Sequence, residues 1–504
     1  MFKAPRGRLS NKSYNLPAPV QGLDAVSSIM QMGEKRALLM ENFFPQPDGL
    51  VMRDGNTAHV TDFTQPVERL HVHAATNGGE SLWGTTVNGI YDCTIAGTMP
   101  AVSMALTNGK TISSSIATGA GNYLMLVNGT DTLKQYDGTS WTSVPTFGGT
   151  ATSIYSYVET YRQRLFFVKR NSLEIEYLAA NSISGTATNY PLGALFRLGG
   201  YIVALGTWTV DGGVGPEDSL AAVSNKGEVV IYSGADPATW SLKGVYFIGR
   251  PLGETPMFKY GGDLLVLTEN GVFPLSSAIQ STAIDRQKAV TGDIKPVLTR
   301  AAQSFRVNQG WQIISNPAVP YLMVNIPSTP VRKQAVMHAQ TGAWTLFSGW
   351  EALYFARVAN EMYFSTNNGV YRVNGFNDNG ANITGKFIQA SSRLGYNTNK
   401  KIEIVRPFLN SNGGFTYSLG ISCNFVNPKE LSQITPHPES TPSDWGSGLF
   451  GEAIWGGDIG ITQDWVSTGD EYSLWKAIYF KVVTNSSRIF YYGSDLAFNV
   501  GGKF

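Results

Sequence analysis

The chain has 504 residues, with 38 Lys and Arg against 37 Asp and Glu, so its formal net charge is +1. This balance excludes a generally basic nucleic-acid-binding protein and a strongly acidic tail protein. Charged residues make up only 15% of the chain and 55 residues are glycine, which indicates a neutral polar surface and many tight turns between short strands.

The first 45 residues are expected to form an extended arm followed by a short helix. Residues 1–23 hold four basic residues, no acid before Asp24 and no apolar period, which indicates an extended segment. This arm would dock on a neighbouring subunit, with contact to DNA or disorder as alternatives. A helical pattern spans Glu34–Asn42 and stops at Pro45. The basic residues are Lys3, Arg6, Arg8 and Lys12.

A recurring β-hairpin dominates residues 46–376. In its clearest copies, two β-favouring runs flank an Asn-Gly pair, which is typical of a two-residue type I′ turn. Looser copies fill the gaps, and the turns fall near positions 88, 128, 171, 226, 270, 327 and 368, so that four of the six steps are 40–44 residues long. The clearest copies are LWGTTVNGIYDC from Leu82, LLVLTENGVFPL from Leu264 and MYFSTNNGVYRVN from Met362.

A β-rich period of this length is the signature of propeller blades, because stacking around an axis buries faces that one blade cannot bury alone. The sequence therefore predicts an all-β β-propeller of about seven blades. Six or eight blades remain alternatives, because the segment around Gly49–Val60 could lend a strand to close the ring. A β-sandwich or barrel with evenly spaced hairpins is the competing architecture.

The hairpin period ends near Phe376, and residues 377–504 are expected to form a separate C-terminal antiparallel β-sandwich-like domain. Four segments alternate apolar and polar residues at period two. A long Trp- and Gly-rich loop, about 427–463, interrupts them. The four segments are KKIEIVRPFL from Lys400, FTYSLGISCNFV from Phe415, LWKAIYFKVV from Leu474 and RIFYYGSDLAFNV from Arg488.

The five histidines and two cysteines do not form a recognisable metal motif. His71 and His73 would share one face of a strand and could supply two ligands, but no third ligand lies near them in sequence, and the polar face of a strand is the favoured interpretation. His59, His338 and His437 are scattered. Cys93 and Cys423 cannot complete a zinc site and are expected to be reduced and mostly buried.

Two short motifs resemble functional sequences and are rejected. Asn108–Thr111 resembles the end of a phosphate-binding loop, but Met104 stands where the first glycine is required, so a turn is expected. Asp137–Trp141 resembles a sialidase Asp-turn, but Asp and Gly are adjacent. No nucleophile elbow or zinc-protease motif occurs, and hydrolysis of a glycoside would need two nearby carboxylates. No catalytic, cofactor-binding or metal residue is therefore assigned.

Three stretches together resemble the tail nozzle or hub proteins of short-tailed bacteriophages, the packaged-DNA stabilisation family. The resemblance covers most of the chain, although only these stretches are specific. They are KRALLMENFFPQPDGLVMRDG from Lys35, the segment Ile231–Ser277, and the Trp-Gly loop with the strand pair ending DLAFNVGG.

This resemblance implies a structural virion protein, made in the host bacterial cytoplasm and located in the phage tail. It would form a homo-oligomeric ring, a hexamer in the family, contact portal-adaptor proteins and tail fibres or tailspikes, and let double-stranded DNA pass without sequence-specific binding. It would retain packaged DNA and serve genome ejection. The family pattern also places Asn42–Pro45 against a blade, and makes Asp236, Pro237 and Trp240 an inter-strand turn with a hydrophobic plug.

The family resemblance carries no catalytic residues, so the protein is not expected to be an enzyme. A segment of about 18 apolar residues, long enough to span a membrane, is absent from the sequence. The alternative function is a carbohydrate-binding or depolymerising β-propeller of a phage tail, because the chain has 11 Trp and propellers commonly host ligands at one end of the ring.

Overall fold

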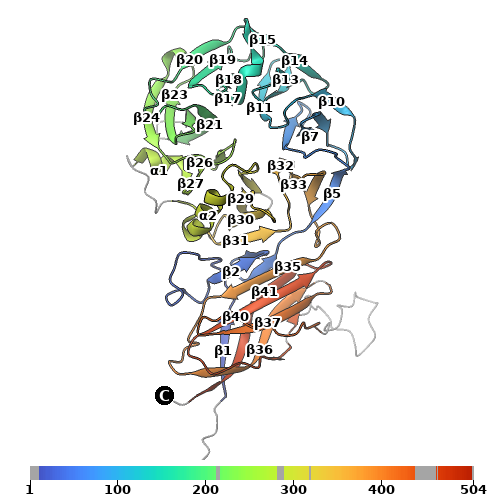
Figure 1. The fold of residues 1–504 in the computed structure, drawn as a ribbon, viewed down its shortest axis with the longest axis vertical. Helices are drawn as coiled ribbons and strands as arrows, with labels where there is room; N and C mark the ends of the chain where they lie inside the picture. Colours follow the sequence, from blue (N-terminus) through green and yellow to red (C-terminus); the bar gives the residue numbers. More distant parts are fainter. Residues whose placement is uncertain are drawn as a thin grey trace, which may run out of the picture. The chain divides into compact units, whose positions relative to one another are not determined.

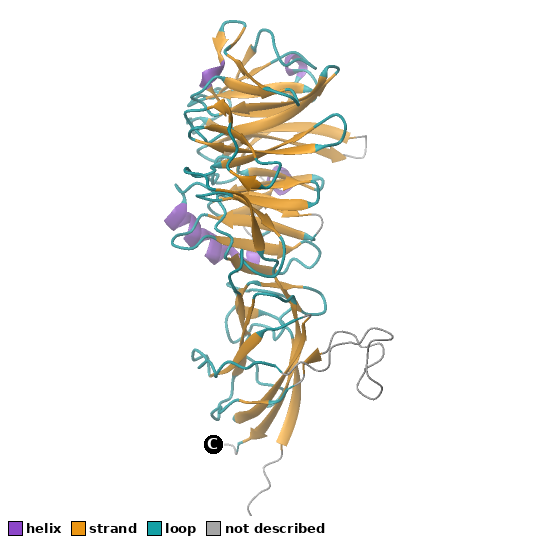
Figure 2. Cartoon of the chain, turned by 90° about the vertical axis from the view of Figure 1, so that its right-hand side faces the viewer, coloured by secondary structure: helices purple, strands orange, loops and turns teal. Residues whose placement is uncertain are grey.

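A computed structural model describes residues 11–211, 216–280, 289–316, 319–411, 413–436, 461–462 and 464–501. The chain divides into two compact units, which we describe separately. The propeller unit comprises Ala58–Gln334 and Glu351–Val373. The terminal unit comprises Met1–Thr57, Ala335–Trp350 and Asn374–Phe504. Strands predominate in each unit (Figure 2).

The propeller unit is a ring of small antiparallel sheets, each built from consecutive strands (Figure 1). The first sheet contains β6 (Arg69–Ala74), β7 (Glu80–Thr86), β8 (Gly89–Asp92) and β10 (Val102–Ala105). The second contains β11 (Ile112–Thr118), β12 (Gly121–Val127), β13 (Leu133–Tyr136) and β14 (Trp141–Val144). The third contains β17 (Tyr155–Tyr161), β18 (Arg164–Lys169), β19 (Glu174–Tyr177) and β20 (Thr188–Pro191).

Four further groups of strands continue the ring. The fourth sheet contains β21 (Ile202–Asp211), β22 (Pro216–Ser224), β23 (Glu228–Ser233) and β24 (Ser241–Phe247). The fifth contains β25 (Met257–Tyr260), β26 (Asp263–Thr268) and β27 (Gly271–Pro274). The sixth begins with β28 (Gln312–Asn316) and β29 (Tyr321–Ile326), and the seventh contains β32 (Tyr354–Val358), β33 (Glu361–Ser365) and β34 (Val370–Val373). The predicted propeller of about seven blades is confirmed.

Minor elements connect the blades. They are β9 (Gly97–Thr98), β15 (Thr146–Phe147), β16 (Thr150–Ala151), η1 (Thr152–Ile154), η2 (Pro237–Thr239), α1 (Leu275–Gln280), η4 (Gly292–Ile294) and α2 (Lys295–Phe305). The turn η2 joins β23 to β24, and Trp240 behind it stacks on Phe166 and Tyr232 at ring-centroid distances of 5.3 and 5.2 Å. Trp240 thus fills the space beside this turn with an aromatic cluster.

A strand from the N-terminal side closes the ring. β5 (Asn56–Thr61) pairs with β34 in the seventh sheet, and β9 joins β5 as a parallel neighbour. The segment Gly49–Val60, considered as a source of a closing strand, therefore does supply one. Hydrogen bonds between strands from opposite ends of the unit replace a covalent connection and leave no open edge at the closure.

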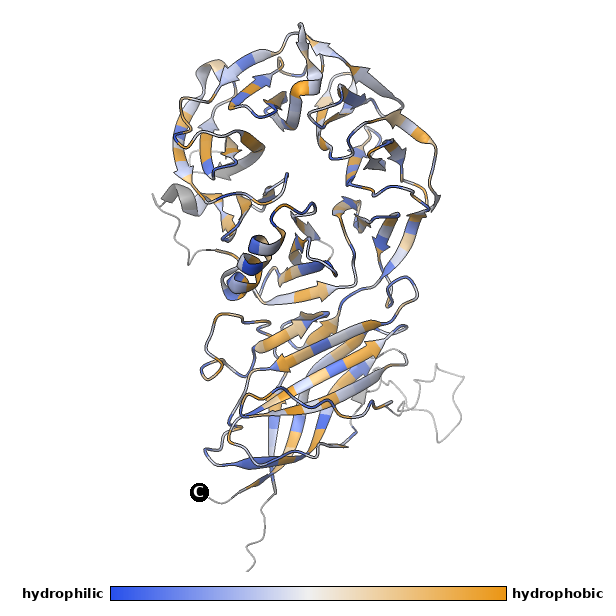
Figure 3. Cartoon of the chain, in the orientation of Figure 1, coloured by the Kyte–Doolittle hydropathy of each residue, from blue (hydrophilic) through white to orange (hydrophobic). Residues whose placement is uncertain are grey.

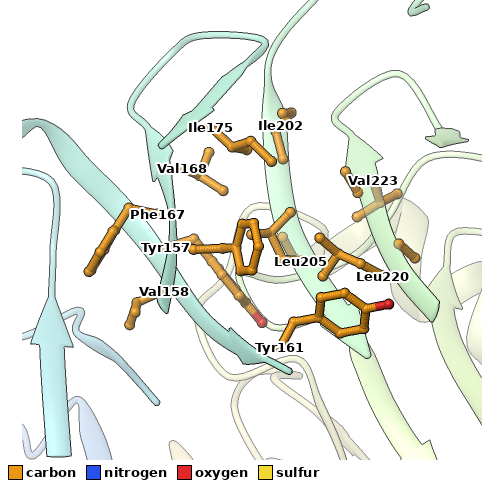
Figure 4. Packing of buried hydrophobic residues seen from close by; sticks show 14 of the residues in the cluster. Tyr157, Val158, Tyr161, Phe167, Val168, Ile175, Ile202, Leu205, Leu220 and Val223 are labelled. Atoms are coloured by element: carbon orange, nitrogen blue, oxygen red, sulfur yellow. The ribbon is translucent and has the colours of Figure 1, made fainter. Parts of the chain in front are cut away.

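Apolar side chains fill the seams between adjacent blades. Around the third and fourth blades, Tyr157 and Tyr161 of β17 lie on the side of Leu205 of β21 and Leu220 of β22, whereas Val158 points to the other side of β17 (Figure 4). Val158 and Leu205 are at most 1% exposed. Burying side chains of this size contributes roughly 1.5–3 kcal/mol each, so a blade is stabilised mainly by its neighbours.

The hairpin turns differ from the predicted type I′ geometry. Asn88, Asn270 and Asn368 lie in the described chain, and none of them has a positive φ. Instead a hydroxyl two residues earlier accepts a hydrogen bond from each asparagine N–H, at 3.0 Å from Thr86, 3.2 Å from Thr268 and 3.3 Å from Thr366. Such a hydroxyl-centred turn satisfies the asparagine N–H without a left-handed asparagine, although Gly271 of the second turn has a φ of +125°.

The glycine of these turns is required by a close approach of the backbone. A Cβ on Gly369 would lie 2.4 Å from the Val60 carbonyl oxygen of the closing strand β5. A Cβ on Gly89 would lie 2.6 Å from the Met104 carbonyl oxygen of β10. The chain therefore passes against each turn at a distance that only glycine permits.

The terminal unit is a sandwich of two sheets. One sheet runs β3 (Phe43–Pro45), β4 (Leu50–Met52), β41 (Ile489–Val500), β36 (Lys400–Ser411) and β38 (Ile461–Thr462), with β39 (Val466–Ser467) on β36. The other runs β2 (Ala37–Glu41), β35 (Ile383–Gln389), β40 (Lys476–Thr484) and β37 (Thr416–Cys423). β30 (Lys333–His338) begins in the propeller unit and ends here, where β31 (Trp344–Ser348) also lies.

An aromatic cluster joins the two sheets of the sandwich. Phe387 of β35 lies 5.0 Å from Tyr491 of β41 and 5.5 Å from Phe480 of β40 between ring centroids. Phe43, the first residue of β3, packs 5.7 Å from Phe387. Polar and apolar residues alternate along these strands (Figure 3), and all four strand segments predicted from period-two alternation are confirmed.

Residues 11–17 are extended, as predicted, but they pair within their own chain instead of forming a separate arm. These residues form β1 (Asn11–Pro17), which pairs with β41 of the same chain from Asn11↔Asn499 to Pro17↔Gly493. Leu16 is 2% exposed. Because β41 takes up the hydrogen-bonding groups of this segment, the segment contributes to its own terminal unit. Lys3, Arg6 and Arg8 lie outside the described residues.

The predicted helix over Glu34–Asn42 is wrong. Residues Ala37–Glu41 form β2, which pairs antiparallel with β35, for example Met40↔Phe387. A two-turn helix is below the roughly 12–15 residues at which an isolated helix becomes marginally stable. Pairing with β35 instead satisfies the backbone and buries Ala37 and Met40.

A buried ion pair lies in the terminal unit. The guanidinium of Arg53, whose side chain is 1% exposed, binds both carboxylate oxygens of Asp378 at 2.9 and 2.6 Å. It also donates to Asn42 Oδ1 at 2.9 Å. A Cβ on Gly349 would lie 2.4 Å from both the guanidinium and the carboxylate, so glycine is required beside this pair.

Candidate functional site at the propeller mouth

A cavity of the propeller unit lies where its innermost strands begin. Its volume is about 400 Å³, and Arg69 of β6, Ile112 of β11, Ile202 of β21 and Tyr354 of β32 contribute to its wall. These strands line the axis of the ring (Figure 1). We call this cavity the mouth. The volume lies within the ~300–1,000 Å³ typical of small-molecule sites.

Arg69 is the most buried charged group of the mouth. Its side chain is 4% exposed and forms an ion pair with Glu254, a residue of the segment before β25. Its guanidinium carbon lies 4.3 Å from the ring centroid of Tyr354, a cation–π contact. The Nε–H of Arg69 finds no hydrogen-bond acceptor among the described residues. Glu254 and Tyr354 thus hold the Arg69 side chain in place, and its Nε–H donor has no described partner.

Three further cations line the mouth. Arg306 lies 3.8 Å from Glu269. Lys110 and Arg170 are exposed and form no ion pair with any residue that the structure describes. Burial raises the pKa of Glu68 next to Arg69, although Lys110 acts to lower it. Four cations therefore surround the cavity, and Glu254 is the one carboxylate among its described lining residues.

Amide side chains from successive connections complete the wall. Asn225, in the turn after β22, accepts at its Oδ1 from the Tyr201 N–H at 3.1 Å, which leaves its NH₂ group without a described acceptor. Gln309 donates to the Glu68 carbonyl oxygen at 3.2 Å, which leaves its own oxygen facing no described donor. The amide of Asn171 makes no hydrogen bond within the described chain. The mouth thus offers both donors and acceptors.

His71 and His73 share one face of β6, and both contact residues of the second blade. His71 bonds through Nδ1 and Nε2 to the hydroxyls of Ser113 and Thr111, both at 2.7 Å. Burial, with the nearby Arg69 charge, lowers the pKa of His71 to about 3. His73 Nε2 lies 3.0 Å from the Asn122 carbonyl oxygen. The favoured sequence interpretation, polar residues of a strand rather than ligands, matches these contacts.

The remaining histidines and the cysteines take separate positions. His59 contacts the Cys93 carbonyl oxygen at 2.9 Å, and His338 stacks on Phe44 at 5.2 Å in the terminal unit. His437 lies outside the described residues. Cys93 is buried, whereas Cys423 is only partly so. No group of three or more His, Cys, Asp or Glu side chains in the described ranges could hold a metal ion.

Both rejected motifs form turns. In Asn108–Thr111 the Lys110 N–H donates to Asn108 Oδ1 at 3.0 Å, and strand β11 follows rather than a helix. Asp137 accepts from the N–H groups of Thr139 and Ser140 at 2.8 and 2.7 Å, which lowers the pKa of its carboxyl and joins β13 to β14.

Of the cations of the mouth, only Lys110 belongs to a motif considered in the sequence, the Asn108–Thr111 segment that was rejected as a phosphate-binding loop. Arg69 begins β6, Lys110 precedes β11, Arg170 follows β18 and Arg306 follows helix α2, so no linear spacing connects them. The one available signal is positional, because Arg69 and Tyr354 each begin an innermost strand and strand beginnings meet at one end of a propeller.

No protein-family model matches this chain. No curated protein matches it either. Solved structures with a similar fold include BBS1N in complex with ARL6DN, with a TM-score of 0.42 and 10% identity over 64% of this chain and 98% of that one. YCF48 bound to a D1 peptide has a TM-score of 0.37 and 11% identity over 67% and 97% of the chains. The dihydro-heme d1 dehydrogenase NirN has a TM-score of 0.33 and 11% identity over 59% and 68%.

No helix within the described ranges has both the length and the apolar character required to cross a lipid bilayer.

Proposed function

We propose that this chain is a structural subunit of the tail nozzle or hub of a short-tailed bacteriophage. In this role it forms a homo-oligomeric ring below the portal and adaptor, extends the DNA channel, retains the packaged genome and serves its ejection. The proposal rests on the three sequence stretches that resemble this family and on an architecture in which charged groups form structural pairs.

The observation that carries the assembly part of the proposal is the outer edge of the fourth blade. β24 is the last strand of its sheet, and Leu242, Val245 and Phe247 are 43%, 37% and 55% exposed. Monomeric proteins usually protect the edge of a sheet with charges, bulges or cover, and exposed apolar groups together mark interaction surfaces. A neighbouring subunit would cover this edge.

The buried charges of the described chain favour a structural role. Arg53 pairs with Asp378, and Lys476 pairs with Asp470 at 2.5 Å with both side chains 1% exposed. Each of these groups has its partner inside the fold, as expected for charges that fix a structure rather than react.

Native mass spectrometry of the purified chain and electron microscopy of isolated tails test this proposal. We expect a ring in solution or in the tail, and weaker association of the double variant Leu242→Asp/Phe247→Asp. Val331→Asp is the matched control, because Val331 is also 43% exposed but lies in the turn before β30. A chain that stays monomeric and is absent from tails would contradict the proposal.

A carbohydrate-binding or depolymerising tail propeller is the second candidate, and the mouth is the observation that favours it. The mouth combines amides, guanidinium groups and the aromatic residues Tyr201 and Tyr354. Hydrolysis by the usual mechanism needs two carboxylates about 5–10 Å apart, whereas the described lining supplies Glu254 alone. The geometry therefore favours binding over cleavage, and incubation with host surface polysaccharide distinguishes the two.

A further inference from the structure

We infer that the mouth of the propeller binds an acidic saccharide, that is, a sugar carrying a carboxylate or phosphate group. The inference deepens the second candidate function and does not depend on ring assembly. It rests on three observations about the cavity: an excess of cations, a guanidinium held in a fixed position, and unused amide groups of both polarities.

The charge of the mouth selects an anion. Of its four cations, Arg69 is neutralised by Glu254 and Arg306 is partly balanced by Glu269 at 3.8 Å. Lys110 and Arg170 have no acidic partner within 4 Å in the described chain. An oxyanion placed between them would form charge-assisted hydrogen bonds, which are about twice as strong as neutral ones.

The buried guanidinium of Arg69 supplies a fixed donor. Its position is set by the Glu254 carboxylate and the Tyr354 ring, so it needs no reorganisation to meet a ligand. Its Nε–H is buried without a described acceptor. The same burial keeps this Nε–H out of reach of a ligand, so any donor that Arg69 offers to the mouth comes from its terminal nitrogens.

The unused amides fit hydroxyl groups. Asn225 uses only its oxygen in a described hydrogen bond, and the amide of Asn171 uses neither atom, so the NH₂ groups of both can donate to a ligand. Asn308 and Gln309 use only their NH₂ groups, so their side-chain oxygens can accept. A sugar hydroxyl both donates and accepts. A volume of about 400 Å³ suits one or two sugar rings.

Nucleic acid fits the mouth less well. Binding of single strands depends on aromatic faces that are open for base stacking. Trp311 is 1% exposed and the guanidinium of Arg69 covers the ring of Tyr354, which leaves Tyr201, 39% exposed, as the one open ring among the described lining residues, whereas stacking of successive bases needs several. The cations are also confined to one cavity and do not form a track that could follow a phosphate backbone.

Isothermal titration calorimetry of the full chain tests the inference. The probes are trigalacturonic acid, its neutral counterpart galactotriose, glucose 6-phosphate and a twelve-nucleotide single-stranded DNA. We expect one of the two acidic sugars to bind, the neutral sugar to bind at least tenfold more weakly, and the variant Lys110→Gln/Arg170→Gln to lose at least tenfold in affinity. The response to the two acidic sugars distinguishes a carboxylate from a phosphate.

Lys243→Gln is the control, because Lys243 is exposed on β24 of the fourth blade and does not line the mouth. Lys110 and Arg170 are exposed, so the double variant is expected to fold, and its circular dichroism spectrum and ring formation are compared with those of the parent. Binding that is equal for acidic and neutral sugars, tighter for DNA, absent for both acidic sugars, or unchanged in the double variant would overturn the inference.

Discussion

The propeller unit and the terminal unit are both made of antiparallel strands, but they differ in which parts of the chain they join. In the propeller, β17 and β18 pair across a turn of two residues, Arg162 and Gln163. In the terminal unit, β1 pairs with β41 and β2 pairs with β35, so that each sheet joins both ends of the chain. Sheets of the first kind can form locally, whereas sheets of the second kind need nearly the whole chain.

This difference determines what could be predicted from the sequence. A hairpin such as Leu264–Pro274 contains both strands and its turn within one short segment, so the local sequence pattern was sufficient to predict it. The segment Ala37–Glu41 has its partner in β35, and a local helical pattern gave the wrong element. The turn geometry was also missed, because an Asn-Gly pair indicates a turn but does not show that the hydroxyl of Thr268 would bond its backbone.

The mouth could not be predicted for the same reason. Its charged residues Arg69, Lys110, Arg170 and Arg306 come from separate segments of the chain, and no motif spacing brings them together. The ring closure brings Tyr354 against Arg69, which is a consequence of the fold rather than of any local pattern.

Removal of strand β1 should have the largest effect, because it should destabilise the terminal unit and leave the propeller unit unchanged. Deletion of residues 1–17 strips a pairing partner from β41 and exposes the apolar surroundings of Leu16. We expect hydrogen–deuterium exchange to accelerate strongly in β36 and β41, while peptides from β17 and β18 of the propeller keep their protection. The control Lys12→Ala/Ser13→Ala retains the backbone pairing and should exchange like the parent.

Equal loss of protection in both units would show that the two regions fold as one cooperative body. Unchanged protection in β41 would mean that β1 contributes little to the terminal unit, contrary to the pairing described above.

The buried ion pair gives the next largest effect. Asp378→Ala leaves the buried Arg53 guanidinium without its bidentate partner, which typically costs about 3–5 kcal/mol. Chemical denaturation followed by exchange in the terminal unit measures this loss. Asp54→Ala is the control, because the Arg488–Asp54 pair is 44% and 30% exposed and an exposed pair contributes about 0–1 kcal/mol. Similar losses for both variants would disprove a special role for Arg53.

The propeller can be tested at its closure. Gly369→Ala would place a Cβ 2.4 Å from the Val60 carbonyl oxygen, and forcing this contact apart should cost about 1–3 kcal/mol. We expect faster exchange in β5 and β34 without loss of the other blades. Gly262→Ala, where no atom lies within 4 Å of the added Cβ, should have little effect. If exchange in β5 and β34 is the same in the two variants, the close approach at Gly369 does not determine the stability of the ring closure.

The last predicted effect is a pH dependence within the propeller. Burial raises the pKa of Glu159 on β17 to about 8, with Thr207 and Lys259 acting in the opposite direction. The folded chain therefore retains a proton that the unfolded chain releases above its ordinary pKa of 4.5. The neutral carboxyl contributes fully below pH 4.5, and stability is lost as the pH rises through 8.

Glu159→Gln should remove this slope. Compared with the parent, the variant should gain a few degrees in Tm at pH 8.5 and little at pH 4.5, as measured by differential scanning calorimetry across this range. A parallel shift at all pH values would show that the titration of Glu159 does not contribute.

The closing strand β5 has a consequence for biosynthesis. β5 ends at Thr61 and its partner β34 begins at Val370, so the ribosome must make six blades before the ring can shut. At about 5–20 residues per second, β5 waits on the order of 15–60 s with its backbone unpaired on that side. During that interval the nascent chain presents an open β edge, at which a chaperone or a second nascent chain could bind before the protein's own last blade arrives.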